Sequence, residues 1–424
     1  MYSQKENGFN VSTFKGSEVE IGEKHGRLLG KEIEKVIERF SFALTNDYGK
    51  DWQWFRDFSV SNFSERLDER IKSEMNAIPA SSAKHNGTSF KFEDLLTLNC
   101  IAEIDSYFSA HEKSAVDGRC SSFIANGKYT MDGDYILGHT TWWRYYLANS
   151  FKHFFIFKPE SGIPFAMQSA PGFLFSFTDF YYNKSGIAIS ETTLDGIHTY
   201  NAGGTPLFQR LRLAIQHSST VEDAVYHITK DNTGAYPNDY LIGSMDGIAL
   251  LELGTFNYSL MKRKEGFFVS SNRVQFDNLY SECTINYDTL NDSDTSRFLR
   301  LNELVSSGKL DNESAKRILS DHYDSYRREN RPGKNTICGH RETEPLRDTF
   351  DKRPAFFTTG SIDGKIVTGK GAVSGSSTLK WGKPCGAQFS SEEFLSSHPE
   401  YEWLRGHLED ISPGAWYQFD HGWE

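Results

Sequence analysis

The chain has no cluster of basic residues, and its formal net charge is −11 over 424 residues. Nucleic acids and anionic membrane surfaces attract proteins through concentrated positive charge, so neither is an expected partner. No apolar run approaches the roughly 20 residues that cross a bilayer, so a membrane span is not expected. These absences leave a soluble globular protein as the expected class.

Cysteine is scarce, with only Cys100, Cys120, Cys283, Cys338 and Cys385. None belongs to a C-x-x-C pair, so the thiol-rich zinc pattern is absent, and neither a metal site nor a cofactor is expected. The odd count leaves at least one thiol unpaired. The first twenty residues lack the basic and apolar segments of a secretory signal, so a cytoplasmic location is expected, although a chain that had lost its leader would look the same.

Aromatic residues are abundant, at 14% of the chain, which favours a well-packed core. Apolar spacing predicts helices over residues 17–44, 52–79 and 89–110, and the second is expected to stop at Pro79 because proline breaks helices. After Gly118 the sequence pattern changes, and it predicts short β-strands instead of long helices.

Within this second part, turn residues and apolar runs predict further helices and two hairpins. The helices are expected near residues 206–218, 220–231, 294–306 and 311–321, and the hairpins turn at 183–186 and span 354–369. The alternation of helical and strand segments is consistent with stacked layers of sheet and helix. No change in composition marks a domain boundary, and the strongest candidate for one is a peptide bond that could be cleaved, between Arg119 and Cys120.

Cys120 lies in "DGRCSSFIANG", between a polar stretch and a predicted strand. A buried cysteine is commonly a small apolar core residue. Alternatively, its thiol can attack the preceding carbonyl, and an acyl shift from nitrogen to sulfur followed by hydrolysis exposes Cys120 as a new N-terminus. The freed α-amine, with an ordinary pKa of about 7.7–8.0, can then act as the base for the same thiol.

Several motifs, which follow one another along the chain, favour the nucleophile over the core residue. They are "GRCSSFIANGKYTMDGDYILGHTTWWRY", "SAPGFLFSFTDFYYNKSGIAISETT", "NTGAYPNDYLIG", "TSRFLRL" and "KNTICGHRE". Together they resemble the cysteine N-terminal-nucleophile hydrolases, and within these the phospholipase B-like proteins and the penicillin acyltransferase-like group. The resemblance covers most of the chain.

The resemblance implies an α+β fold, a four-layer αββα sandwich. It implies a helical propeptide of residues 1–119 packed on a catalytic part of residues 120–424, cut between Arg119 and Cys120, with the two fragments remaining associated. Related acylases often carry Arg and Asp in a "G-R-N-x-D-W" segment, whereas this chain has "GHTTWW", so that the phospholipase B-like variant fits better.

Three residues are candidate partners of Cys120. His139 lies on the next predicted strand, where a neutral imidazole can bond the thiol, the new amine or substrate, although a strand histidine can be purely structural. By resemblance, Asn238 supplies an oxyanion donor and Arg297 borders the nucleophile and supports its thiolate. The alternatives are a turn asparagine and a surface arginine, and Arg300 competes with Arg297.

Other candidates concern substrate. Thr140, Trp142 and Trp143 are expected to line a pocket, and the aromatic residues between 142 and 182 are candidates for an apolar acyl site. Cys338 and His340 lie two residues apart with no third partner visible, which favours a structural or pocket-lining role.

The sequence therefore predicts a self-processing hydrolase that cleaves a linear amide through an S-acyl-enzyme at Cys120. An N-acylated small molecule, a lipid amide or a short peptide would suit the aromatic segment. The alternatives are phospholipase B-like deacylation of glycerophospholipids and an uncleaved, catalytically silent binding protein that keeps the fold.

Overall fold

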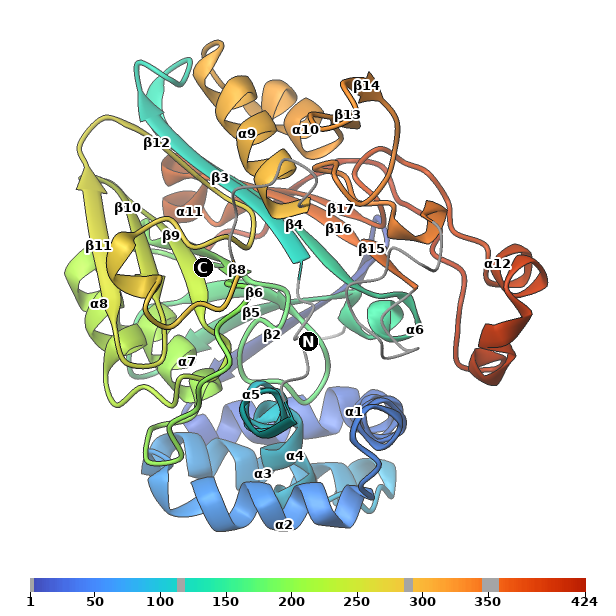
Figure 1. Cartoon of the computed structure of the whole chain (residues 1–424). Coiled ribbons are helices and arrows are strands. Elements are labelled where there is room, and N and C mark those ends of the chain that lie inside the picture. Colours follow the sequence, from blue (N-terminus) through green and yellow to red (C-terminus); the bar gives the residue numbers. More distant parts are fainter. Residues whose placement is uncertain (1–3, 113–118, 286–292, 345–357) are drawn as a thin grey trace.

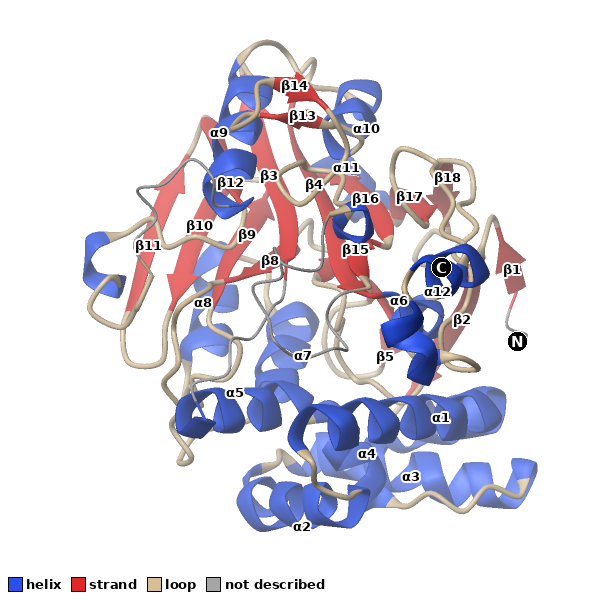
Figure 2. Ribbon diagram, turned by 45° about the vertical axis from the view of Figure 1, so that its right-hand side comes forward, coloured by secondary structure: helices blue, strands red, loops and turns tan. Residues whose placement is uncertain are grey.

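Two large β-sheets dominate the computed structural model, which describes residues 4–112, 119–285, 293–344 and 358–424 (Figures 1 and 2). The first sheet has nine strands in the described chain. In spatial order they are β1 (Gln4–Glu6), β2 (Phe9–Gly16), β5 (His153–Pro159), β6 (Phe165–Ser169), β7 (Phe180–Asn183), β8 (Ala188–Thr193), β9 (Asn238–Ser244), β10 (Gly247–Leu253) and β11 (Tyr258–Arg263). All neighbours run antiparallel except β2 and β5, which are parallel.

The second sheet holds Cys120 at the start of its second strand, next to the edge strand. Its path is β12 (Gly266–Ser270), β3 (Arg119–Gly127), β4 (Gly133–Arg144), β16 (Asp363–Thr368), β17 (Ser376–Trp381) and β18 (Tyr417–Asp420), and β15 (Thr359–Ser361) also pairs with β4. Cys120 is the second residue of β3, which lies between β12 and β4. A separate short ladder joins β13 (Tyr323–Asp324) and β14 (Glu329–Asn330).

Helices cover the sheets and form a layer of their own at the bottom of Figure 1. That layer contains α1 (Glu18–Tyr48), α2 (Trp52–Phe63), α3 (Glu69–Asn86), α4 (Phe92–Asn99) and α5 (Ile101–Glu112). Two helices, α7 (Leu207–His217) and α8 (Val221–Thr229), contact the nine-stranded sheet, whereas α9 (Ser293–Ser306) and α10 (Asn312–Leu319) contact the second sheet. The remaining helices are α6 (Tyr145–Ala148), α11 (Gly369–Ser374) and α12 (Ser391–Ser397). The expected α+β class is confirmed.

Alternation along β3 fixes the direction of the thiol. Phe123 and Ala125 pack in the cluster that includes residues of α9 and α10, whereas Ile124 belongs to the main core and Ser122 bonds Ser190 of the other sheet. Successive side chains of a strand point to opposite faces. Cys120 has the parity of Ser122 and Ile124, so it faces the space between the sheets.

The N-terminal segment differs from the expected helical propeptide, because it begins with β1 and β2. The alternating apolar residues Phe9 and Val11 place β2 inside the nine-stranded sheet, beside β5. The expected stop at Pro79 was also wrong, since α3 continues to Asn86 and ends at Gly87, whose φ of 65° provides the left-handed cap. Residues 89–110 form two helices that meet at Cys100.

The two predicted hairpins had different outcomes. The hairpin that turns at residues 183–186 is confirmed by the antiparallel pairing of β7 and β8. The hairpin over residues 354–369 was wrong for the part that is described, since β15 and β16 both pair with β4. Residues 354–357 of that segment lie outside the described part of the chain. The two strands instead extend the sheet along one neighbour, which brings Asp363 and Lys365 beside Thr141 and His139.

Two acidic residues lie opposite each other inside the nine-stranded sheet, away from the nucleophile. Asp239 of β9 is the cross-strand partner of Glu252 of β10, and both are fully buried. The Glu252 carboxyl accepts backbone hydrogen bonds from Gln275 at 2.5 Å and Phe276 at 2.9 Å. Burial and the nearby Asp239 nevertheless raise the pKa of Glu252 from 4.5 to about 9.

Replacement Glu252→Gln should therefore stabilise the protein increasingly as pH rises. Between the ordinary pKa of 4.5 and about 9, the native state keeps a proton that the unfolded chain has lost, so this group's contribution falls with pH. Glutamine has no proton to lose, and its relative gain should reach up to about 1.4 kcal/mol per pH unit in that window.

Urea denaturation of the Glu252→Gln variant across the window measures this gain. Because only the slope against pH is compared, a constant effect of altered hydrogen bonds cancels. Glu313→Gln, at a side chain that is 67% exposed, is the matched control and should follow the wild type. Parallel stability curves for Glu252→Gln and the wild type would contradict the prediction.

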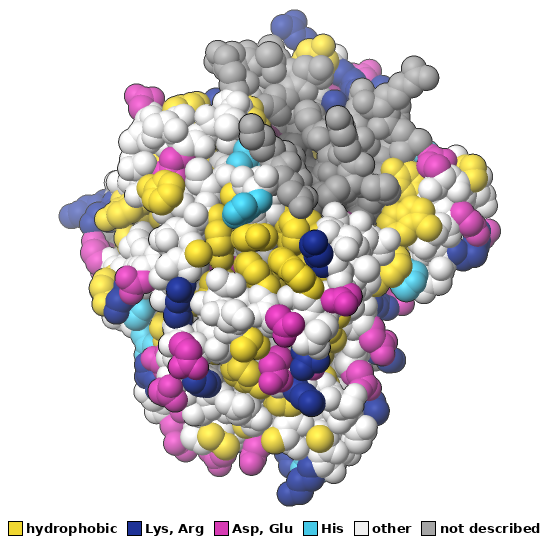
Figure 3. All heavy atoms as spheres, turned by 60° about the horizontal axis from the view of Figure 1, so that its bottom comes forward, with side chains coloured by type: hydrophobic (Ala, Val, Ile, Leu, Met, Phe, Trp, Pro, Cys, Tyr) yellow, Lys and Arg dark blue, Asp and Glu magenta, His cyan; other side chains and the backbone are white. Residues whose placement is uncertain are grey.

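The surface carries both signs of charge. In the face seen in Figure 3, acidic and basic side chains are interspersed, and hydrophobic side chains gather near the centre. Within the described part of the chain, no helix is both long and apolar enough to cross a membrane.

Candidate active site

Cys120 is held at both its backbone nitrogen and its thiol. The backbone N–H donates to Asn272 Oδ1 at 3.0 Å, and Sγ donates to Asp179 Oδ2 at 3.5 Å. The side chain is only 1% exposed. Burial and the neighbouring Asp179 raise the pKa of the thiol well above 9.0, so Cys120 is an uncharged thiol in this environment.

Asp179 is the carboxylate nearest the thiol. Its φ of 63° places it in the left-handed region, and the Tyr236 hydroxyl also donates to its Oδ2, at 3.4 Å. Burial raises the pKa of Asp179 to about 7, although Lys365 and the hydrogen bond from Cys120 act in the opposite direction. This carboxyl can therefore gain or lose a proton near neutral pH.

His139 lies beside the thiol as predicted. One ligand atom from each of Cys120, His139 and Asp179 lies within 4.8 Å of the others. His139 Nε2 lies 2.8 Å from the backbone oxygen of Glu191, so Nε2 carries the hydrogen, and Nδ1 has no hydrogen-bond partner among the described residues. Burial and Lys365 hold the pKa of His139 well below 6.5, which leaves a neutral ring with a lone pair on Nδ1.

Lys365 is the cation of this site. Its Nζ donates to Thr141 Oγ1 at 2.6 Å, forms an ion pair with Asp363 at 3.0 Å, and bonds the backbone oxygen of Thr178. The side chain is fully buried. Its positive charge lowers the pKa of both the Cys120 thiol and Asp179, against the larger effect of burial.

Arg297 borders the nucleophile through its backbone. The guanidinium donates to the Cys120 backbone oxygen, to Ser121 Oγ at 3.1 Å and to Asn272 Oδ1 at 2.9 Å, and it pairs with Asp294 at 2.8 Å. These contacts fix the start of β3. Arg297 bonds the carbonyl of Cys120, and Lys365 is a cation that lowers the pKa of the thiol, so the support of a thiolate by Arg297 stays a prediction.

Arg300, the competitor of Arg297, takes part in a different group of contacts. It pairs with Asp321 at 2.7 Å and with Glu303 at 2.9 Å. The arginine that meets the start of β3 is therefore Arg297.

Asn238 is the first residue of β9, which pairs with β8 in the nine-stranded sheet. Its side-chain nitrogen donates to the Tyr236 backbone oxygen at 2.9 Å and to Glu191 Oε2 at 3.3 Å, while its Oδ1 has no partner among the described residues. Its amide hydrogens are thus directed at protein acceptors in this structure. Tyr236 connects the two groups, since its hydroxyl bonds Asp179.

The three predicted pocket residues are divided between the two faces of β4. Thr140 and Trp142 have the parity opposite to His139: the Thr140 hydroxyl donates to the Asp363 backbone oxygen at 2.7 Å, and Trp142 stacks under the Arg297 guanidinium at 4.8 Å. Trp143 has the parity of His139, and its ring lies 5.4 Å from that of Phe177. The threonine that points into the site is therefore Thr141.

The aromatic residues expected to form an acyl site pack against one another. The rings of Phe151 and Phe173 lie 5.9 Å and 5.2 Å from Phe177, and Phe40 of α1 contacts all three. They make a core between the helical layer and the sheets. A small cavity of about 20 Å³ lies at Tyr236, and its lining also includes Ala102, Asp105, Ser106, Ser109, Thr193, Leu194, Gly196, Ile197, His198, Thr199 and Pro237.

Sequence reasoning missed Asp179, Asn272, Lys365 and Tyr236. Asp179 and Tyr236 lie within the motifs "TDFYY" and "GAYPN", so the sequence motifs could have identified both. Asn272 and Lys365 lie in segments read only as strands. Their roles depend on which strands pair, and the sequence carries no local signal for that.

Cys120, His139 and Asp179 also offer three potential metal ligands. However, the buried Lys365 ammonium opposes a second cation in the same space. The arrangement suits proton transfer and nucleophilic attack better than metal binding.

The chain is similar to several known proteins over part of its length. A 257-residue stretch is 23% identical to an uncharacterized protein of Archaeoglobus fulgidus, which is 57% of this chain and 42% of that protein, so the chain spans less than half of this relative. A mutant conjugated bile acid hydrolase from Clostridium perfringens matches with a TM-score of 0.38 at 13% identity, over 61% of this chain and 88% of that chain. A second variant of that hydrolase matches with a TM-score of 0.30 at 10% identity, over 62% and 81%.

The family match covers the nucleophile segment itself. The profile of the family described as Phospholipase B matches residues 64–260, which contain Cys120, His139, Asp179 and Asn238. The recognition of a phospholipase B-like protein is thereby confirmed: residues 64–260 are similar to the Phospholipase B family.

Proposed function

We propose that this protein is a self-processing N-terminal-nucleophile hydrolase that cleaves a linear amide through a thioester on Cys120. The family match supports a hydrolase. The helices on both sheets, together with the contacts between β3 and β8, support the αββα sandwich that such an enzyme requires.

One observation carries the proposal: the nitrogen and the sulfur of a single residue are bonded to separate fixed acceptors. Asn272 accepts from the nitrogen and Asp179 accepts from the thiol. Any buried backbone N–H needs an acceptor, but a core cysteine needs no carboxylate at its sulfur. A residue that is to supply both a nucleophile and, after cleavage, an amine needs both.

Self-processing begins with transfer of the thiol proton to Asp179, whose pKa of about 7 suits a base at neutral pH. The sulfur attacks the Arg119 carbonyl carbon, the bond from that carbon to the Cys120 nitrogen breaks, and the nitrogen takes the proton. Water then hydrolyses the thioester, which yields a carboxylate on Arg119 and regenerates the thiol. Arg297 and Asn272 hold the backbone of Cys120 during these steps.

The amide reaction repeats this chemistry with an external substrate. The new α-amine, held by Asn272 Oδ1, takes the thiol proton and passes it to the leaving amine as the substrate C–N bond breaks. Water then releases the acyl group from sulfur. His139 offers the Nδ1 lone pair as an acceptor, and Asn238 is proposed as an oxyanion donor once substrate displaces one of its present acceptors.

The proposed substrate is an N-acylated small molecule, a lipid amide or a short peptide. The cavity at Tyr236, whose hydroxyl reaches Asp179, holds only about 20 Å³, so the proposal requires the lining of this cavity to move when substrate binds. Deacylation of a glycerophospholipid ester is the second candidate, because the family description favours it and a thioester intermediate serves both reactions.

The test combines intact-mass measurement with acyl trapping. Purified wild-type protein should yield two fragments, residues 1–119 and 120–424, that elute together because β2 belongs to the nine-stranded sheet. Incubation with matched amides and esters should add an acyl mass to the fragment that begins with Cys120. Faster labelling by amides supports the proposal, faster labelling by esters supports the second candidate, and an intact, unlabelled chain at every pH identifies a silent binding protein.

A further inference from the structure

Four side chains far apart in the sequence converge at a second place in the molecule. His322, Cys338, His340 and Cys385 each offer one ligand atom, and these atoms all lie within 4.8 Å of one another. His340 Nε2 lies 3.1 Å from His322 Nε2, 3.5 Å from Cys338 Sγ and 3.4 Å from Cys385 Sγ. Cys338 and His340 are buried, while the other two are half-buried.

Hydrogen bonding does not explain this convergence. A ring nitrogen has either one hydrogen or one lone pair, so His340 Nε2 cannot satisfy three neighbours. A tetrahedral zinc ion with bonds of about 2.0 Å to nitrogen and 2.3 Å to sulfur separates two nitrogens by about 3.3 Å, and a nitrogen from a sulfur by about 3.5 Å. The three observed separations follow these values closely.

We propose that His322, Cys338, His340 and Cys385 bind a Zn²⁺ ion. Two imidazoles and two thiolates complete a tetrahedral set, which leaves no open position for water or substrate, so the ion is structural. An iron–sulfur cluster with the same residues places the histidines and cysteines on different irons. The short distances from His340 to both sulfurs favour a single ion instead.

The surroundings orient the ligands as metal sites require. His340 Nδ1 lies 3.2 Å from Glu342 Oε1, which fixes the tautomer that leaves Nε2 free for the metal. Glu342 is held in turn by the Tyr145 hydroxyl at 2.7 Å and by Lys383. The Ala387 backbone N–H donates to Cys385 Sγ at 3.4 Å, in a turn where Gly386 adopts a φ of 91°.

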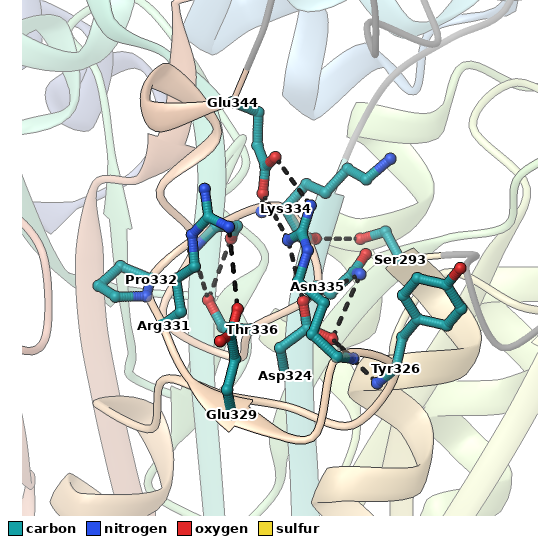
Figure 4. A network of polar contacts seen from close by, with 12 residues as sticks. Ser293, Asp324, Tyr326, Glu329, Arg331, Pro332, Lys334, Asn335, Thr336 and Glu344 are labelled. Atoms are coloured by element: carbon teal, nitrogen blue, oxygen red, sulfur yellow. Dashed lines mark hydrogen bonds and ion pairs between the residues drawn. The ribbon is translucent and has the colours of Figure 1, made fainter.

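The segment that carries three of the ligands is built around buried polar contacts. Figure 4 shows Asn335 bonded to Asp324 and the Lys334 backbone bonded to Glu344, at 3.2 Å in each case. The Cys338 backbone N–H donates to the Asp321 backbone oxygen at 3.1 Å, which brings His322 beside the thiol. The zinc ion would join this segment to Cys385, in the loop that follows β17, and so hold the two parts of the chain together.

The experiment uses the full chain, purified under reducing conditions after growth with added zinc. Metal analysis should find one zinc ion per chain. Cys338→Ser, Cys385→Ser and His322→Ala should each lose it, whereas Cys283→Ser, which changes a half-buried cysteine outside the cluster, should retain it. Glu342→Gln should weaken zinc binding about 10- to 100-fold without removing a ligand.

Cobalt substitution of the wild-type protein covers the case in which the variants fail to fold. Co²⁺ should give the absorption bands of tetrahedral coordination and a thiolate-to-metal charge-transfer band, both removed by added Zn²⁺. A chain that binds neither metal, or one in which Cys338 and Cys385 are joined as a disulfide after reduction and zinc addition, overturns the proposal. The test is independent of hydrolysis, because it measures bound metal alone.

Discussion

Replacement Cys120→Ala should leave a single uncut chain of 424 residues that accepts no acyl group from any substrate. In the proposed mechanism the substitution removes the atom that attacks both the Arg119 carbonyl and the substrate, and the described site has no second thiol to replace it. Loss of an essential nucleophile lowers the rate by factors of the order of 10⁶. Intact-mass measurement and acyl trapping read the two reactions separately.

Cys120→Ser and Cys283→Ser make this result specific. A hydroxyl can form the analogous ester, so Cys120→Ser should cut slowly, whereas Cys283→Ser should cut and react as the wild type does. Normal cleavage of Cys120→Ala would show that the thiol is not the processing nucleophile. Because Cys120 is a small buried side chain, alanine should leave the fold intact, and a matching circular dichroism spectrum checks this.

Replacement Arg297→Met should destabilise the protein by about 3–5 kcal/mol, the range found when one partner of a buried ion pair is removed. Both Arg297 and Asp294 are buried, and the guanidinium also bonds the Cys120 carbonyl and Asn272. The start of β3 would lose its fixed donors. We therefore expect a lower urea midpoint and a lower fraction of cut chain in the molecules that remain folded.

Arg300→Met is the matched control, because it lies one helical turn further along α9 and its pair with Asp321 is partly exposed. Its cost should be about 1 kcal/mol or less, and cleavage should proceed normally. Arg297→Lys keeps the charge but cannot reproduce the forked contacts, so it should recover only part of the loss. Equal effects of the two methionine substitutions would show that Arg297 has no special relation to the nucleophile.

Local signals in the sequence predicted many elements of the fold but not their partners. The turn at residues 183–186 was correctly predicted because asparagine and glycine specify a hairpin. The helix end at Pro79 was wrong because tertiary packing against α1 sustains α3 through the proline. The hairpin over 354–369 was wrong because adjacency in sequence does not decide which strand a segment joins.

The same limit applies to the two clusters of functional side chains. Cys120 and His139 lie on consecutive strands, so their proximity followed from a simple hairpin. Asn272 and Lys365 come from strands or loops that reach β3 and β4 only through the sheet order. In the second cluster, His322 precedes Cys338 by 16 positions without a second ligand beside it, and Cys385 follows 47 positions later, so the pair Cys338 and His340 looked incomplete.

The position of β2 in the sheet implies that folding of the whole chain comes before the proposed cleavage. Without residues 9–16, β5 would become the bare edge of a sheet rich in phenylalanine, and such an edge invites pairing with other molecules. A gene that began at Cys120 would therefore produce aggregates. If the proposed cleavage takes place, it must therefore follow the incorporation of β2 into the sheet.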